Sequence, residues 1–559
     1  MINNTNPIWL VIEELKRYKI KIILITILLL ISSIFGLTIP LVNQKLVDDG
    51  ILKGNFNDVC KLTAIGLGIY LLKLLTEFIY SYLITYINSK IRFSLYQKTF
   101  YTLENLKIKY FTHKKSTEIY NNINSDINNI SKLFDNNILT FISQIIYFIG
   151  GIILMSLINW KISILVILSI PIKYFGVSLL GNIGKKISNK YIEISAEYAE
   201  WFADTIEGIK DVKIYNLFKS KEIEFEEKKE KMRVLETKSG IVSAIKSQYD
   251  QMNIQIVVLL IYLIGAKMIF AEHLSYGELT AILSYLTYIN LPISYFLSVK
   301  FIYATIKPSI NRLHSFLKEE KENNTGCSIS TDKKELKIKF ENVSFSYGSN
   351  KKIFKNLSFD IKPGEKVAII GDNGVGKTTI LSLLLRFYEP QEGKIILGNT
   401  NIQEFKLNQY RELFAVNGVD SHLFNCTVHE NIVFQKKQNK FLKYRICTLD
   451  GGMNCKNLSS GEKQKILLER SLQMKRPIVI LDEATAHIDK KSRTEFEIHF
   501  NEIFKKSTVI IIAHTSEILK YVDKIIEITI NGAVVYKSED IDNIKFTNLM
   551  DKSDVQINT

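Results

Sequence analysis

The stretch GDNGVGKTT, residues 371–379, has residue types and a spacing that could hold the phosphates of a nucleotide. It fits the pattern G-x-x-x-x-G-K-[ST] between an apolar strand, KVAII, and a helical sequence, which is the context that this motif needs. Backbone N–H groups at Gly371, Gly374 and Gly376 can surround phosphate oxygens at the positive end of the helix dipole. Lys377 is predicted to reach the β and γ phosphates of ATP, and the Thr378 hydroxyl to ligate Mg²⁺. The other predicted ATP-binding residues of this loop are Asp372, Asn373, Val375 and Thr379.

Two later strand ends carry groups suited to the same chemistry. PIVILDEATAHID places Asp482 at the end of an apolar strand, where it can hold Mg²⁺ through water. Glu483 follows it and is predicted to act as general base on the attacking water. STVIIIAHTSEI is a third apolar strand, and it leads into His514. Because strand ends of this kind meet at one edge of a sheet, His514 is predicted to contact the γ-phosphate, although a histidine at the edge of the core is the alternative.

Apolar runs that could cross a membrane fill the half of the chain before these motifs. A helix needs about 20 apolar residues to span the hydrocarbon layer. The sequence predicts six spans: Ile20–Val42, Val59–Tyr82, Leu139–Ile158, Ile162–Leu180, Asn253–Phe270 and Tyr276–Ile302. Lys73 and Glu77 lie four residues apart in the second span, which favours an ion pair along one helix over a contact with a substrate. Lys173, Asn290 and Lys300 are weaker candidates for a substrate contact.

The connections between the spans differ in length and in charge. The stretches Asn88–Asn137 and Gly181–Gln251 are long and polar, with helical patterning and many lysines, whereas the other connections are short. Loops of this length are not simple linkers, so each is predicted to continue two membrane helices to a turn at its tip. The excess of Lys and Arg in these loops and at the N-terminus places both long loops and both termini in the cytoplasm.

The overall charge agrees with a membrane protein. The chain has 72 Lys and Arg against 57 Asp and Glu, a net charge of +15. Much of this excess flanks the apolar runs, which favours membrane lipid over nucleic acid as a partner. The five cysteines form no CxxC pair, and most lie in the polar half, so a reducing compartment is expected. The spans exclude a soluble GTPase or kinase.

Together with the segment NLSSGEKQKILLERS, these features resemble the ATP-binding cassette (ABC) transporter family. The resemblance covers nearly the whole chain and implies a six-helix, all-α transmembrane domain of exporter type followed by an α/β P-loop NTPase domain. It implies that two chains pair, so that each ATP lies between the P-loop of one and the signature LSSGE of the other. In that reading Ser459, Ser460, Gly461 and Glu462 face the partner's ATP.

The resemblance also assigns roles outside the P-loop and the signature. Tyr347, in VSFSYGSN, resembles the aromatic residue that stacks on adenine, and Asp489, in AHID, ends the segment that communicates across the dimer. YFTHKKSTEIYNNINSDINNI resembles the first coupling-helix region, and AEWFADTIEGIKDVKIYNLF resembles the second, which docks on the partner's cassette. Arg312, in TIKPSINRLHSFL, also stands at a familiar place for this family.

The sequence departs from the family pattern at several positions. NGVDSHLF has Val419 where members usually carry a glutamine, and valine can neither ligate Mg²⁺ nor position water. Ser460 and Glu462 stand where glycine and glutamine are commoner, and Ala486 and His487 replace the commoner serine and alanine. The helical stretch before the signature is also short. These changes are expected to alter coupling, whereas Lys377, Asp482, Glu483 and His514 argue for a working ATPase.

We therefore expect a transmembrane domain over residues 1–320, a solvated linker over 321–334 and a nucleotide-binding domain over 335–559. The expected function is ATP-driven export of a peptide, a lipid or a hydrophobic small molecule across the bacterial cytoplasmic membrane, with ATP and Mg²⁺ as cofactors. The expected partner is a second half-transporter chain, with a homodimer favoured over a heterodimer. The alternatives are an ATP-binding subunit with a degenerate site in a heterodimer, and an importer that uses the exporter fold.

Overall fold

The fold is described from a computed structural model of the full chain. It describes residues 7, 9–112, 114–329, 336–348, 352–418, 421–434, 449–482, 488–512, 516–529 and 532–537. The chain divides into two compact units. The membrane unit contains residues 1–103 and 117–319, and the cassette unit contains residues 104–116 and 320–559.

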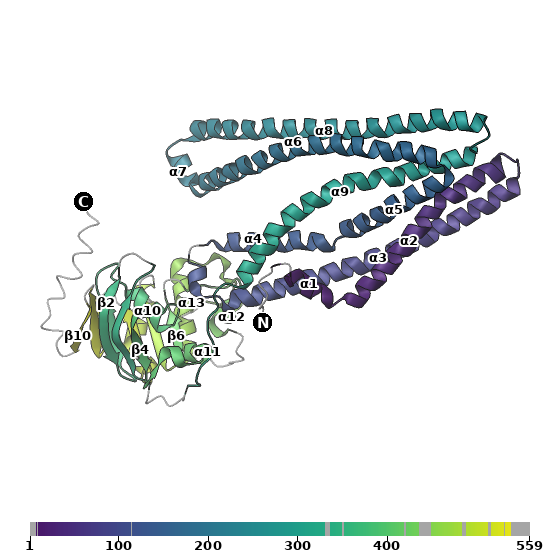
Figure 1. The fold of residues 1–559 in the computed structure, drawn as a ribbon. Coiled ribbons are helices and arrows are strands. Elements are labelled where there is room, and N and C mark those ends of the chain that lie inside the picture. Colours follow the sequence, from purple (N-terminus) through teal and green to yellow (C-terminus); the bar gives the residue numbers. More distant parts are fainter. Residues whose placement is uncertain are drawn as a thin grey trace. The chain divides into compact units, whose positions relative to one another are not determined.

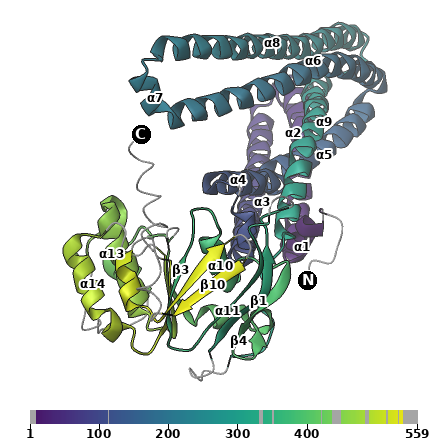
Figure 2. The same ribbon diagram turned by 90° about the vertical axis from the view of Figure 1, so that its left-hand side faces the viewer.

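Long helices make up the membrane unit (Figures 1 and 2). Their bounds are α1 Trp9–Lys16, α2 Lys19–Lys45, α3 Phe56–Asn105, α4 Ser116–Ser131, α5 Asn136–Ile158, α6 Trp160–Glu207, α7 Ile209–Ile214, α8 Phe218–Phe270 and α9 Tyr276–Leu317. In the described part of the chain, five helices are long and apolar enough to cross a membrane: Lys19–Ile51, Phe56–Asn105, Leu139–Ile158, Trp160–Glu207 and Phe218–Phe270. The sixth predicted span, Tyr276–Ile302, lies within α9.

The second long loop has the predicted form and the first only in part. α6 continues from its span to Glu207, the chain turns at Gly208 and α7, and α8 returns from Phe218 into the next span. α3 likewise continues past its span to Asn105. The return arm of the first loop is broken, because a 3₁₀ turn at Lys132–Phe134 and an extended Asp135 separate α4 from α5. The prediction of one continuous return helix there is wrong.

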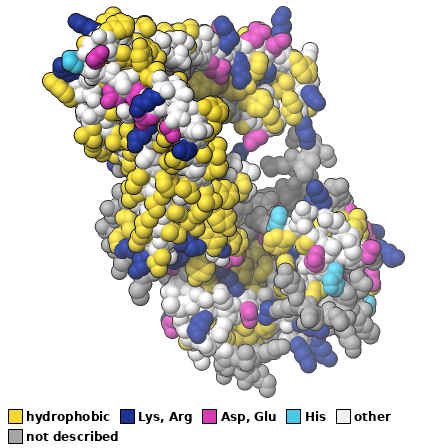
Figure 3. All heavy atoms as spheres, turned by 90° about the vertical axis from the view of Figure 1, so that its right-hand side faces the viewer, with side chains coloured by type: hydrophobic (Ala, Val, Ile, Leu, Met, Phe, Trp, Pro, Cys, Tyr) yellow, Lys and Arg dark blue, Asp and Glu magenta, His cyan; other side chains and the backbone are white. Residues whose placement is uncertain are grey.

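Apolar side chains cover much of the outer surface of the membrane unit, as expected of helices that face lipid (Figure 3). Its interior holds an apolar cluster built from α2, α5, α6, α8 and α9, with Met155, Ile162, Ile261 and Ile282 among its fully buried members. The predicted ion pair is present, with 3.7 Å between Lys73 Nζ and Glu77 Oε1. Ser32 of α2 donates a hydrogen bond to the same carboxylate oxygen at 3.2 Å, so this pair also joins α3 to α2.

The cassette unit contains two sheets. An antiparallel sheet has the strand order β2-β1-β4-β5, and a second, largely parallel sheet has the order β10-β9-β3-β8-β7-β6. The strand bounds are β1 Ile338–Phe345, β2 Phe354–Ile361, β3 Lys366–Ile370, β4 Glu392–Leu397, β5 Thr400–Asn401, β6 Phe414–Asn417, β7 Ile478–Asp482, β8 Thr508–Ile512, β9 Lys524–Thr529 and β10 Gly532–Lys537. The helices are α10 Lys377–Leu384, α11 Leu407–Arg411, α12 Val428–Val433, α13 Ser460–Gln473 and α14 Lys490–Ile503.

Buried aliphatic residues fill both faces of the parallel sheet, as its continuous apolar strands require. Parallel pairing of β3, β8 and β7 brings their carboxyl ends to one edge. The three strands that the sequence predicts to carry the site are therefore neighbours. This arrangement is that of a doubly wound sheet, which binds ligands at the carboxyl ends of its strands.

The predicted linker is attached to the cassette unit over its described part. Glu322 forms two hydrogen bonds of 2.7 Å with the guanidinium of Arg411, on α11. Further along, the N–H of Cys327 donates to the carbonyl of Glu404 at 2.8 Å, and the N–H of Lys406 donates to the carbonyl of Cys327 at 3.0 Å. Residues 321–329 are thus attached to the cassette by these hydrogen bonds, while most of them stay exposed to solvent, as predicted for a solvated linker.

Part of the first long loop also belongs to the cassette unit. The N–H of Lys107 donates to the carbonyl of Glu320 at 3.2 Å, and the N–H of Glu322 donates to the carbonyl of Asn105 at 2.7 Å. These bonds attach residues 104–116, which we call the loop segment, to the chain just before the cassette. The predicted boundaries had left the loop segment with the membrane domain.

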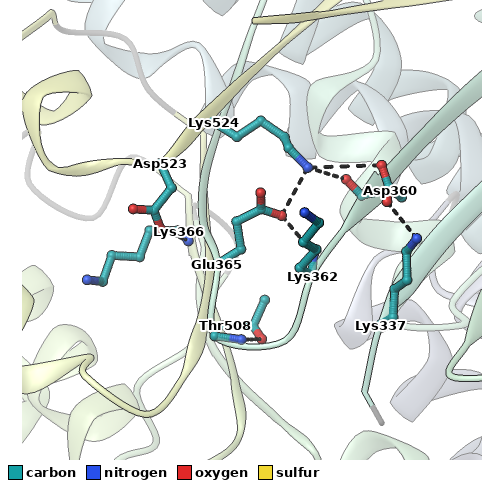
Figure 4. A network of polar contacts seen from close by, with 9 residues as sticks. Lys337, Asp360, Lys362, Glu365, Lys366, Thr508, Asp523 and Lys524 are labelled. Atoms are coloured by element: carbon teal, nitrogen blue, oxygen red, sulfur yellow. Dashed lines mark hydrogen bonds and ion pairs between the residues drawn. The ribbon is translucent and has the colours of Figure 1, made fainter. Parts of the chain in front are cut away.

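A polar network fixes the amino ends of the parallel strands, at the edge opposite the strand ends that carry the motifs (Figure 4). Lys524, at the start of β9, donates hydrogen bonds of 3.0 Å to the carbonyl of Asp360 and to the carboxylate of Glu365. Lys337 Nζ lies 2.7 Å from Asp360 Oδ2. The hydrogen bond from Lys337 lowers the pKa of Asp360, so this stabilising contact is present above the ordinary value of 3.8 and is lost as the pH falls through the lower folded value.

We expect Lys524→Met to lower the stability of the cassette by about 2 kcal/mol, because Glu365 would remain largely buried without its cation. In a unit of this size that corresponds to a fall of about 4 to 8 °C in the unfolding midpoint of the cassette. Calorimetry on the full chain measures it. Lys394→Met removes an exposed ion pair with Glu341 and serves as the control, for which we expect a change below about 2 °C. Equal shifts in the two variants would contradict this account.

Candidate functional site

The P-loop joins the end of β3 to the start of α10, as the motif predicts. Gly376 stands at the N-terminus of α10 with φ +106°, a left-handed conformation in which a side chain would also collide with Ile353. Gly371 has φ +145°, and a Cβ there would lie 2.6 Å from the carbonyl oxygen of Ile528. Only glycine meets both demands.

Lys377 is held over this loop. Its side chain is largely buried, and Nζ donates hydrogen bonds to the carbonyls of Gly371 at 2.7 Å and Asp372 at 3.2 Å. A cavity of about 370 Å³ beside it is lined in part by Asn373, Thr378 and Asp482. The P-loop and the end of β7, about 100 residues apart in the sequence, therefore open onto one space, as predicted.

Oxygen ligands for Mg²⁺ also meet in this cavity. Asp482 ends β7 and is only 4% exposed, whereas Thr378 is exposed on the first turn of α10. Both residues line the 370 Å³ cavity. A carboxylate and a hydroxyl next to a phosphate-binding loop are the donors that a hard cation such as Mg²⁺ requires. The described residues thus fit the ion that the sequence predicts.

Tyr347, the predicted adenine-stacking residue, lies beside the P-loop with its ring half exposed. Its hydroxyl donates to the hydroxyl of Thr379 at 3.3 Å. Its ring lies edge-on to that of Tyr388, with 4.9 Å between centroids. The hydroxyl of Tyr388 in turn lies 3.1 Å from that of Thr112, on the loop segment. Sequence reasoning missed Tyr388, because nothing local to it indicates this contact.

The space around these rings is larger than the phosphate site. A cavity of about 1300 Å³ is lined by residues of the loop segment, by Tyr347 and Tyr388, and by Thr378 and Asp482, the predicted Mg²⁺ ligands. A nucleotide that fills the phosphate site and reaches Tyr347 therefore also lies near the loop segment. The cavity offers room for the base and ribose that the phosphate site alone lacks.

Three predicted residues lie outside the described part of the chain. Glu483, His514 and Val419 follow directly or closely after β7, β8 and β6. The strands that precede them are neighbours with the same direction, in the order β8-β7-β6. Their assignments as general base, γ-phosphate contact and missing glutamine stay predictions. The same holds for Ala486 and His487.

The signature segment forms the N-terminus of α13. Ser459 caps the helix, accepting a hydrogen bond from the N–H of Glu462 at 3.3 Å, and Glu462 accepts from the Ser459 N–H at 2.8 Å and from its hydroxyl at 2.7 Å. This reciprocal capping box holds the turn that Ser460 and Gly461 complete. The hydrogen bonds from Ser459 lower the pKa of Glu462, so the carboxylate is ionised at neutral pH. Because glutamate stands where glutamine is commoner, a negatively charged carboxylate lies next to Ser459, the serine that is predicted to face the partner's phosphate.

We expect Glu462→Gln to raise the apparent affinity for ATP by about three- to tenfold, since it removes a charge that opposes a phosphate while the amide still accepts the Ser459 N–H. The Michaelis constant for ATP, measured on the full chain, tests this. Glu430→Gln is the control, because Glu430 makes the same capping box with Thr427 on α12. A change in both variants, or in neither, would count against the predicted role of the signature.

Asp489 is tied to the signature helix of its own chain. It caps α14 by accepting a hydrogen bond from the N–H of Ser492 at 3.0 Å, and it forms an ion pair with Lys465 of α13. The hydrogen bond from Lys465 holds the pKa of Asp489 well below its usual range. This ion pair therefore joins the start of α14 to α13, the helix that begins at the signature. Lys465 is a second residue that the sequence did not reveal.

The short helical stretch before the signature keeps a small core of its own. Val428, Ile432, Leu458 and Ile466 are buried together. Arg470 donates hydrogen bonds to the carbonyl of Asn431 at 2.7 Å and of His422 at 3.0 Å. Burial lowers the pKa of this guanidinium to about 10. The loss of length has thus not removed the packing that supports α13.

Comparisons with known proteins agree with the fold. The model of the ABC transporter transmembrane region matches residues 22–293, and the ABC transporter model matches residues 354–486. An ATP-dependent lipid A-core flippase of Haemophilus influenzae is 24% identical over 535 residues, covering 92% of this chain and 91% of the relative. A protein of the same description from Vibrio vulnificus is 24% identical over 558 residues, covering 96% and 95%.

A solved structure shows the same fold over nearly the full length. A bacterial Atm1-family ABC exporter with ATP bound matches with a TM-score of 0.76 at 18% identity, covering 96% of this chain and 98% of that one. The two fused family models together span most of the chain, in the order that a half-transporter requires. The chain belongs to the ABC transporter family, as an exporter-type transmembrane domain fused to an ATP-hydrolysing cassette.

Proposed function

We propose that this chain exports an amphipathic, lipid-like substrate from the cytoplasm across the bacterial cytoplasmic membrane, in a dimer driven by ATP. The observation that carries the coupling is the contact between the loop segment and the nucleotide site. Thr112 meets Tyr388, and Tyr388 meets Tyr347 beside the P-loop. A nucleotide that stacks on Tyr347 therefore acts on a segment that continues, through the chain, into α3 on one side and α4 on the other.

In this proposal the cassette residues hold ATP and activate water. The P-loop N–H groups and Lys377 bind the phosphates, and Ser459 of the partner chain closes the site over the γ-phosphate. Mg²⁺ held by Thr378 and Asp482 would neutralise charge on the phosphates. Glu483 accepts the proton of the attacking water, and His514 contacts the γ-phosphate. ATP moves the protein only because it binds the closed pair of cassettes better than the open pair.

The substrate class rests on the relatives and on the apolar surface of the membrane unit. Full-length relatives with about a quarter of their residues identical are lipid A-core flippases. Apolar side chains cover much of the face of the membrane unit that Figure 3 shows. A substrate that reaches the protein from the bilayer suits such a surface, and among the substrates that the sequence allowed we favour a lipid over a peptide or a drug-like compound.

The tip of the second long loop supports pairing with a second chain. Ile214 and Tyr215, at the end of α7, are 73% and 70% exposed, and Phe218 beside them is also exposed. Apolar side chains at a predicted cytoplasmic tip lack lipid to cover them, and the cassette of a partner would do so. We propose an identical chain as this partner, with both termini and both cassettes in the cytoplasm. A heterodimer with a degenerate site here is the second candidate, because Val419 removes the usual glutamine.

The test is ATP turnover by the chain expressed alone in nanodiscs, next to Glu483→Gln. We expect turnover in the unmodified chain and a loss of about 100-fold or more in Glu483→Gln.

Lipid movement is tested with the same chain in liposomes that contain a nitrobenzoxadiazole-labelled phospholipid. Only when ATP is present should the chain change the fraction of label that a membrane-impermeant quencher reaches. Tyr388→Phe should keep turnover and weaken this lipid movement. ATP binding without turnover would instead favour the heterodimer, and movement of label in the opposite direction would favour an importer.

A further inference from the structure

A lysine inside a predicted span is buried where two groups of helices meet. α6 and α8 lie side by side in both ribbon views, whereas α9 runs with α5 (Figures 1 and 2). Lys173 of α6 is 1% exposed. Its Nζ lies 2.8 Å from a carboxylate oxygen of Asp250 on α8, and it donates to the carbonyl of Asn290 on α9 at 3.1 Å and to the Asn290 amide oxygen at 3.4 Å. One side chain thus ties the two groups together.

These three residues stand at the cytoplasmic limit of the apolar cluster of the membrane unit. On α6, Ile162 and Val166 belong to that cluster and precede Lys173 as the helix runs inward. On α8 and α9 the corresponding cluster members are Val257 and Ile289, each on the outer side of Asp250 or Asn290. Apolar packing holds the two groups together outward of Lys173. The polar contact is therefore the innermost tie between them that the described side chains show.

The α6–α8 pair does not depend on this lysine. The hydroxyl of Tyr249, on α8, donates to the carbonyl of Ile172 on α6 at 3.0 Å, one residue away from the ion pair. The two helices also pack along their cytoplasmic extensions, where Trp201 donates to Glu224 at 2.6 Å and Tyr191 to Glu236 at 2.7 Å. Loss of the Lys173 side chain should therefore leave α6 and α8 together and release only α9.

We propose that Lys173 is the positioning residue that holds the α6–α8 pair against α9, and that the contact with Asn290 is made in one access state and broken in the other. A charged group in a span is costly to keep and is retained where it acts. The two residues that accept from Lys173 differ in charge, and this difference suits a contact that is broken on one side only. The carboxylate of Asp250 keeps Lys173 paired on its own group of helices, while the neutral oxygens of Asn290 can be given up to water at lower cost. Breaking and remaking the Lys173–Asn290 contact would be part of the conformational change that exports the substrate, so the inference rests on the proposed function.

Distances between spin labels test the proposal in the full chain in nanodiscs. The labels are placed in a background without native cysteines. Labels on Thr237 of α8 and Asn311 of α9 measure distances across the interface between the α6–α8 pair and α9, which we call the seam. Labels on Thr237 and on Asn189 of α6 measure distances within the α6–α8 pair. In nucleotide-free Lys173→Met we expect the seam distances to shift toward the longer population by about tenfold in ratio. The distances within the pair should stay unchanged. Seam distances that overlay those of the unmodified chain, with and without ATP, would overturn the proposal.

Lys73→Met is the matched control, because Lys73 is also an ion-paired lysine in a span but its carboxylate partner Glu77 lies on its own helix. It should leave the seam distances unchanged, and an equal shift in this control would also overturn the proposal. If Lys173→Met does not fold, Asp250→Asn keeps the shape of the site but weakens the acceptor on the α6–α8 side, so Lys173 depends more on Asn290 and the same distances should shift toward the shorter population. The nucleotide-free measurement needs no turnover. An inactive chain would therefore refute the proposed function while still testing this contact.

Discussion

Lys377→Ala should lower ATP turnover by about 100-fold or more and weaken ATP binding to a similar degree. The side chain is largely buried, and two carbonyls of the P-loop already hold its ammonium where the phosphates are predicted to lie. The charge needs no reorganisation when the nucleotide binds, and in a low-dielectric site such a preorganised charge contributes about 3 to 4 kcal/mol. Turnover in nanodiscs and equilibrium binding of a fluorescent ATP analogue measure the two effects.

Lys366→Ala is the control for this experiment. Lys366 begins β3, the strand that ends at the P-loop, and its Nζ donates to the side chain of Asn501 at 2.8 Å. Both variants thus lose one lysine from the same strand and loop, at opposite edges of the sheet. We expect turnover of Lys366→Ala within about twofold of the unmodified chain. A Lys377→Ala variant that also retained turnover would show that ATP is hydrolysed without this loop.

Arg312→Met should destabilise the membrane unit by about 2 kcal/mol. Asp126 of α4 is 3% exposed, and Arg312 of α9 donates to both of its carboxylate oxygens from Nε at 3.1 Å. Removal of the arginine leaves a buried carboxylate without its cation. The estimate is below that for a fully buried pair, because the Arg312 side chain is 58% exposed and water can reach the site. The unfolding midpoint of the full chain in nanodiscs measures this loss.

The double variant Arg312→Met with Asp126→Asn separates this explanation from lost packing. With the charge on both partners removed, we expect about half or more of the lost stability to return. α4 follows the loop segment directly in the chain, so the first variant should also weaken the response of ATP turnover to added phospholipid. A double variant as unstable as Arg312→Met alone would mean that the arginine acts through packing and not through the buried carboxylate.

Local patterns were enough to predict the architecture and the place of the P-loop between β3 and α10. The length of an apolar run decides whether a helix can span the bilayer, and this length can be counted in the sequence. The P-loop depends on glycines at fixed offsets and on a strand before it, both of which are local. β3, β7 and β8 therefore form where the sequence predicts, and they pair as parallel neighbours with their motif-bearing ends at one edge. The break between α4 and α5 and the attachment of the linker to the cassette were missed, because short breaks and backbone hydrogen bonds of this kind leave no periodic signal.

Only the tertiary structure decided which distant side chains meet. Lys173 contacts Asn290 although the two residues are 117 positions apart in the sequence, and Tyr388 contacts Thr112 at a sequence separation of 276 positions. A lysine in an apolar run shows that a partner is needed, but the partner depends on the rotation and the register of whole helices, which many packing contacts set together. Lys465 and Asp489 are likewise ordinary surface residues until α13 and α14 lie beside each other. The sequence thus determined the elements and the chemistry at their ends, and the packing of those elements determined the contacts through which the site can act on the membrane helices.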